Sequence, residues 1–165
     1  MIVPETAVAA GPPVARTKPS QLTVDPSLEG QVQNALNLYL PLKTPAQMPA
    51  LLATLQAAAP TVHDALESLH YVHFARFLPN PDGSMLWVIT TYDGGLEAYI
   101  MDFVAVLGDV FTEVLQFIQG APRLPVQKFP REFVAFVMAH DLRQVGVWSA
   151  YPNVTVIDIL QEVGR

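Results

Sequence analysis

The sequence predicts an α+β protein with a ferredoxin-like βαββαβ antiparallel sheet, helices on one face of it, extra helices and an extended N-terminal arm. Two observations favour this class. Short β-branched or aromatic segments and segments of helical 3–4 spacing follow one another in the order strand, helix, strand, strand, helix, strand. Hydrophobic residues make up 51% of the 165 residues, which suffices for one core, so we expect a single domain over 31–165. Prolines and small residues without a regular period fill 1–30, which we interpret as the arm.

The first strand is expected over residues 37–42, where Pro41 requires a position that needs no ladder N–H. A helix should start at Thr44, because a capping residue there precedes a proline. Pro60 should end or kink this helix, and Thr61 with Asp64 provides a capping box for a continuation through Leu69.

A β-hairpin is the clearest local pattern. Residues 70–78 and 85–92 predict two strands, and the segment 79–83 between them (Pro-Asn-Pro-Asp-Gly) is typical of a turn. Gly94 and Gly95 then lead into a long helix that should reach Gln119.

The last third of the chain predicts a loop over 121–130 and a shorter helix that ends at His140. A fourth strand is expected over 145–151, followed by a short helix that a capping box opens at Thr155.

Both faces of the predicted sheet are apolar. In the third strand Leu86, Val88, Thr90 and Tyr92 alternate with Met85, Trp87, Ile89 and Thr91, so each face carries large side chains. Helices on one face leave the other uncovered. A second copy of the chain would cover it by sheet-on-sheet pairing, and an enclosed ligand pocket is the alternative.

Composition excludes several classes of function. The chain has no cysteine, so disulfides, thiolate catalysis and sulfur-ligated metals are excluded, and a reducing cytoplasm is the expected location. A net charge of −6 with nine scattered basic residues argues against nucleic acid. Acidic residues in the most apolar helix argue against a membrane span. Four histidines without metal-ligand spacing predict no metal site.

The element order with two apolar sheet faces resembles the dimeric α+β barrel superfamily of ferredoxin-like folds, over roughly 36–151. That superfamily includes antibiotic-biosynthesis monooxygenases, dye-decolourising peroxidases and chlorite dismutases. The peroxidases have a glycine-containing Asp-Gly signature; Asp93-Gly94 matches the pair and lacks the preceding glycine. The resemblance implies a homodimer, and it makes haem a candidate cofactor with His140 as its candidate ligand.

His73 and Arg76 lie in the most polar stretch of an otherwise apolar strand. Alternation puts His73 on one face with Tyr71, Ala75 and Phe77, where it could serve as a base. Arg76 then lies on the opposite face. A purely structural interpretation is also open, with a hydrogen-bonded buried histidine and Arg76 in an ion pair.

Asp93 follows the third strand, at a strand-to-helix loop where ligands often bind. Asp93 could orient Arg76 across the hairpin, and Tyr92 could donate to a ligand. Alternatively, Asp93 only caps the following helix.

Aromatic side chains are the remaining candidates. Trp87, Trp148 and Tyr151 could line a ligand pocket, although aromatic residues on strands also form cores and interfaces. His140 at a helix C-terminus is favoured by the helix dipole without any function.

Two functions are compatible with these patterns. In the first, the chain binds or oxidises a small apolar ligand in a pocket against the sheet, and His73, Arg76 and Asp93 are the catalytic candidates. Alternatively, it is a non-enzymatic dimeric interaction or scaffold module, because broad apolar surfaces mark interaction sites. The patterns leave open whether the chain is an enzyme.

Overall fold

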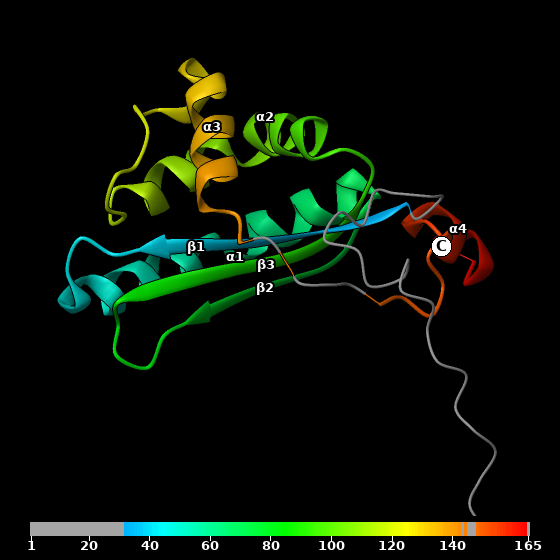
Figure 1. Cartoon of the computed structure of the whole chain (residues 1–165), viewed down its shortest axis with the longest axis horizontal. Helices are drawn as coiled ribbons and strands as arrows, with labels where there is room; N and C mark the ends of the chain where they lie inside the picture. Colours follow the sequence, from blue (N-terminus) through cyan, green and yellow to red (C-terminus); the bar gives the residue numbers. More distant parts are fainter. Residues whose placement is uncertain (1–31, 143, 145–147, 165) are drawn as a thin grey trace, which may run out of the picture.

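The computed structural model describes residues 32–142, 144 and 148–164, so the predicted arm over 1–30 lies outside the described residues. Their α+β architecture confirms the predicted class. Three strands form an antiparallel sheet in the order β1-β3-β2 (Figure 1): β1 Gln33–Pro41, β2 Val72–Pro79 and β3 Met85–Asp93. The helices are α1 Met48–Leu69, α2 Leu96–Leu115, α3 Pro130–His140 and α4 Val156–Glu162, with 3-10 turns η2 Pro45–Gln47 and η3 Val126–Lys128.

The β2–β3 hairpin is confirmed, and its turn chemistry explains it. Gly83 adopts φ 73°, a left-handed conformation that favours glycine. The Asp82 carboxylate accepts hydrogen bonds from the Ser84 backbone N–H at 2.9 Å and from the Ser84 hydroxyl at 2.7 Å. These bonds lower the pKa of Asp82.

Strand β1 begins at Gln33, four residues before its expected start, and ends at Pro41. Pro41 lies opposite Met85 at the end of the β1–β3 ladder. A proline is tolerated in this edge strand because an edge position can spare a ladder N–H.

Helix α1 continues through Pro60 to Leu69, so the continuation to Leu69 is confirmed and, of the two expectations at Pro60, an end of the helix is wrong. Pro60 and Gln56 both lie on the exposed side, so the Gln56 carbonyl, which loses its helical N–H donor, can bind water instead. The capping box expected at Thr61 does not form because the helix is continuous there, and Thr44 makes no side-chain cap.

The core lies between one face of the sheet, which we call the inner face, and helices α1, α2 and α3. Leu36, Leu38 and Leu40 of β1 are buried there, with the alternate residues of β3 that begin at Leu86. Helix α2 ends at Leu115, four residues before the expected end. Its wide apolar stripe is explained by α1, η3 and α3, which pack against it in addition to the sheet.

The other face, which we call the open face, carries Tyr39, Met85, Trp87 and Ile89 with Phe74 and Leu78 of β2. Phe74 is 61% exposed. Figure 1 shows α1, α2 and α3 on the other side of the sheet, and the end of α3 reaches the edge of this face, where the His140 ring lies 5.1 Å from that of Tyr39. The expectation of two apolar faces with helices on one of them is confirmed.

The fourth strand is not formed over residues 148–151, and 145–147 lie outside the described residues. Asp141 makes a single bridge to Leu38 at the free edge of β1, and Val32 N–H donates to the Pro152 carbonyl at 2.9 Å. Between these points the Asp141 carboxylate accepts the Asn37 N–H at 2.9 Å. The Asn37 N–H, which a neighbouring strand would need as a ladder donor, is thus bonded to the Asp141 side chain instead. The prediction of a full βαββαβ sheet is wrong for the described residues.

Candidate functional site

His73 and Asp93 form a buried pair at one end of the open face. The Nε2 of His73 lies 2.8 Å from Oδ1 of Asp93, and the two side chains are only 5% and 11% exposed. A carboxylate can only accept, so Nε2 carries the proton that His73 donates. In a neutral ring, Nδ1 then holds the lone pair.

The chain brings His73 into this position through a β-bulge. Val72 pairs with Tyr92 of the inner face, whereas Phe74 pairs with Thr91 of the open face, and the register shifts between them. One extra residue in a strand exchanges the two faces beyond it. The prediction that His73 shares a face with Ala75 and Phe77 is therefore wrong, because His73 meets Asp93 on the open face.

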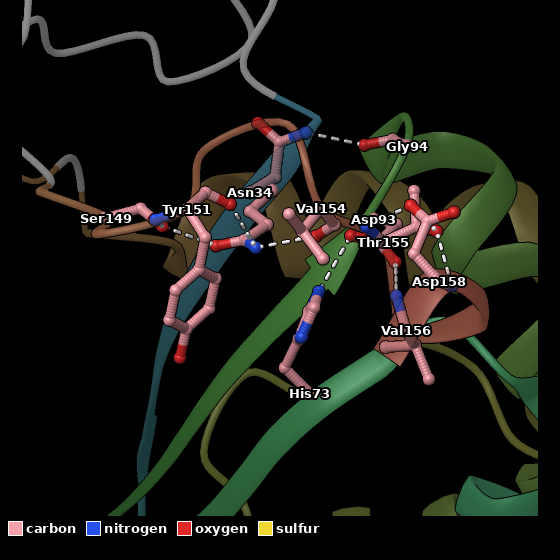
Figure 2. Close-up of polar contacts among 11 residues, drawn as sticks. Asn34, His73, Asp93, Gly94, Ser149, Tyr151, Val154, Thr155, Val156 and Asp158 are labelled. Carbon is pink, nitrogen blue, oxygen red and sulfur yellow. Dashed lines mark hydrogen bonds and ion pairs between the residues drawn. The ribbon is translucent and has the colours of Figure 1, made fainter. Parts of the chain in front are cut away.

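Asp93 holds three parts of the fold together (Figure 2). Its backbone N–H donates to the Tyr71 carbonyl at 2.8 Å, its Oδ1 accepts from His73, and its Oδ2 accepts the Val156 N–H at 2.8 Å. Val156 is the first residue of α4, where the helix dipole also favours a negative charge. The alternative that Asp93 caps the helix directly after it, α2, is not what the structure shows. It caps α4.

The predicted capping box at Thr155 is confirmed and fixes the start of α4. The Asp158 N–H donates to the Thr155 hydroxyl at 3.2 Å, and the Thr155 N–H donates to the Asp158 carboxylate at 2.9 Å. The Thr155 backbone N–H and hydroxyl lower the pKa of Asp158. The α4 N–H bonded to Asp93 is thereby held in place.

A cleft of about 220 Å³ on the open face is lined in part by His73 of this pair. Its walls come from β1, β2, β3 and the segment before α4: Gln33, Asn34, Ala35, His73, Phe74, Thr91, Trp148, Ser149, Ala150 and Tyr151. Phe74, Trp148 and Tyr151 supply aromatic surface, and all three are substantially exposed. In Figure 2 the Tyr151 ring stands on the same side of the sheet strands as His73.

The side chain of Gln33 in β1 is hydrogen-bonded to the segment before α4, which forms one wall of the cleft. Its side-chain amide donates to the carbonyls of Tyr151 at 3.1 Å and Val154 at 2.8 Å, and its Oε1 accepts from the Ser149 hydroxyl at 2.9 Å. The amide of Asn34 donates to the Gly94 carbonyl at 2.6 Å. Much of the polar lining is therefore committed to holding the walls. Sequence analysis missed Gln33, since a glutamine at the start of a strand carries no local signal for contacts over a hundred residues away.

Three of the predicted site residues line the cleft, His73, Trp148 and Tyr151, and a fourth, Asp93, is bonded to His73. Arg76 does not join them. It is exposed on the open face opposite Ile89, four residues along β3 from Asp93, so the expected Asp93–Arg76 contact is wrong. No ion pair is formed by Arg76 within the described residues.

Tyr92 lies on the inner face, away from the cleft. It is buried and stacks on Tyr99, with ring centroids 3.9 Å apart. Burial raises its pKa, and the negative charge of Asp141 adds to this. Tyr92 therefore contributes to the core, so the expectation that it donates to a ligand beside Asp93 is wrong.

Trp87 and His140 also lie apart from the cleft. The Trp87 indole donates to Asn80 at 2.9 Å, and its ring lies 6.3 Å from that of Tyr39. His140 packs against Phe136 and Tyr39, and its Nδ1 bonds the Phe136 carbonyl at 2.8 Å. Neither residue lines the cleft that His73 borders.

Comparison with protein-family models, with curated proteins and with solved structures found no match. In the part of the chain that the structure describes, no three His, Asp or Glu side chains group to hold a metal ion. None of the helices described is long and apolar enough to cross a bilayer.

Proposed function

We propose that the cleft binds a small, uncharged, mainly apolar molecule with one acidic O–H or N–H, and that His73 accepts that proton. The observation that carries the proposal is that His73, which is bonded to Asp93, lines an aromatic-walled cleft. A carboxylate on one ring nitrogen orients the ring and stabilises the imidazolium that forms when the other nitrogen takes a proton.

The size of the cleft supports a ligand with one aromatic ring. A cavity of roughly 150 Å³ accepts benzene, and this cleft measures about 220 Å³. Phe74, Trp148 and Tyr151 offer ring faces for stacking, which favours a flat ligand. The proposed step moves one proton: the ligand's O–H bond breaks and an N–H bond forms at Nδ1 of His73.

4-Nitrophenol tests this proposal, because its phenolate absorbs at longer wavelength than the phenol. At a pH where free nitrophenol is mostly protonated, we expect a phenolate band that grows and saturates as protein is added. The variant His73→Gln keeps a polar side chain of similar size but removes the base, and it should lose the band.

His63→Gln is the matched control, because His63 lies on α1, does not line the cleft and has a side chain that is 76% exposed. Its response should equal that of the wild type. An equal band in His73→Gln, with both variants folded by circular dichroism, would show that His73 is not the base.

A second candidate function is supported by the open face. We propose that two copies of the chain pair through it, as the resemblance to dimeric α+β barrels implies. Phe74 and Leu78 of β2 and Ile89 of β3 are apolar side chains of this face that a second copy would bury, and the exposed Arg76 stands between the two β2 residues. Sedimentation velocity over a range of protein concentrations tests this pairing; a single monomeric species throughout would argue against it.

A further inference from the structure

A second hollow lies on the inner face, between the sheet and helices α1, α2 and α3, and has a volume of about 50 Å³. Apart from Thr90, every side chain that lines it is a hydrocarbon, including Leu38 of β1, Leu86 of β3, Leu66 of α1 and Phe103 of α2. It is separate from the His73 cleft, because the sheet lies between them.

Water is a poor occupant for this hollow. A buried water needs two to four polar partners, and cavities lined by Leu, Ile and Phe stay dry. The polar side chain in the lining, Thr90, already accepts a hydrogen bond from the Tyr99 hydroxyl at 2.8 Å. The chemistry of the walls therefore favours a nonpolar guest.

The lining residues indicate where a guest molecule would rest and where it would enter. Ala75 is the smallest side chain in it and leaves space against β2, where a larger residue would fill the hollow. Phe77, two residues further along the same strand, also lines the hollow and is 38% exposed. Phe77 is the one exposed side chain in this lining, so we place the entrance beside it, at the edge of the sheet.

The volume limits the guest. A cavity of roughly 150 Å³ accepts benzene, so a hollow of about 50 Å³ is too small for an aromatic ring. The walls resist expansion, because Leu86 is fully buried and Leu115 nearly so.

We infer that this hollow is a binding site for a nonpolar molecule of two or three heavy atoms, in the size class of dioxygen, that enters beside Phe77 and rests against Ala75. Xenon is the probe, because it is nonpolar and of this size. In methyl-detected NMR, xenon should cause saturable shifts in the methyl signals of Leu38, Leu86 and Val88, and benzene at its solubility limit should cause none.

Ala75→Ile fills the hollow from within and should abolish the xenon shifts; Ala75→Val is the milder variant should isoleucine disturb folding. Ala35→Ile is the matched control, because Ala35 lies in β1 on the opposite face and borders the His73 cleft. Ala35→Ile should keep the xenon response and weaken nitrophenol binding. A failure of the proposal for the hollow can therefore be told apart from a failure of the proposal for the His73 cleft.

Three outcomes would overturn the inference. The first is the absence of saturable shifts in the wild type. The second is an undiminished xenon response in a folded Ala75 variant. The third is nuclear Overhauser contact between these methyl groups and a long-lived water, which would show that the hollow is hydrated.

Discussion

At the scale of single residues, one extra residue in β2 decides where the candidate base points. The bulge between Val72 and Phe74 turns His73 to the open face and toward Asp93. Alternation in the sequence predicts the opposite face, because a period of two carries no sign of an inserted residue. Asp93 could be singled out from its place after a strand, but its true partners, His73 and the α4 backbone, could not.

Asp141 is a half-buried carboxylate at the free edge of β1. Burial raises its pKa, and the hydrogen bond from the Asn37 N–H only partly opposes this. The folded state therefore keeps the proton to higher pH than the unfolded chain does. Its contribution to stability is complete below the ordinary pKa of an aspartate, about 4, and is lost as pH rises through the higher folded-state value.

Asp141→Asn should consequently gain stability over the wild type as pH rises, since the amide oxygen can accept the same N–H without a charge. At acid pH the two proteins should have similar melting temperatures, and at neutral pH the variant should melt at the higher one. Asp141→Ala, which lacks the acceptor, should be less stable than Asp141→Asn at every pH. A variant less stable than wild type at neutral pH would show that the charge itself is favourable.

At the scale of elements, α4 depends on contacts from distant parts of the chain. It has only seven residues, which is too short for an isolated helix. Its start is held by the Thr155 capping box, by Asp93 from β3 and, through the Val154 carbonyl, by Gln33 from β1. The capping box is a local pattern and could be predicted from the sequence, whereas the other two contacts could not.

Helix α1 offers a direct test of what a proline costs inside a helix. Pro60→Ala restores the N–H donor for the Gln56 carbonyl, and an interior proline is about 3 kcal/mol less favourable than alanine. We expect stabilisation by up to about that amount, reduced because proline also restricts the unfolded chain. Chemical denaturation of the wild type and the variant would measure this difference in the free energy of unfolding, provided that both have the same m-value.

Pro49→Ala is the control in the same helix. Pro49 stands in the first turn, where an N–H has no helical partner in any case. Its replacement should change the free energy of unfolding little. Equal effects of the two substitutions would mean that the Gln56 carbonyl is not the site of the cost.

At the scale of the whole molecule, the sheet is covered on one face and exposed on the other. Leu78, on the open face of β2, is 44% exposed and does not line the His73 cleft. It therefore probes pairing of two copies without altering the cleft. Exposed apolar surface of this kind is costly to leave in water.

Leu78→Asp should shift a dimer to monomer in sedimentation velocity, because pairing would bury the new charge without a partner. Met138→Asp is the matched control, since Met138 is 62% exposed on α3, away from the open face. It should leave the oligomeric state unchanged. If both variants sediment like the wild type, pairing does not use the open face.

The sequence by itself determined the α+β class, the hairpin with its turn, the two apolar faces of the sheet and the capping box of α4. Each of these rests on periodicity or turn chemistry within a few neighbouring residues. The tertiary structure alone decided which face His73 takes, that Asp93 caps α4, that Arg76 and Tyr92 stand apart from the site, and that residues 148–151 do not extend the sheet. Those outcomes depend on bulges, side-chain competition for backbone donors and contacts between distant segments, and the energy of such contacts is not encoded in any local stretch of chain.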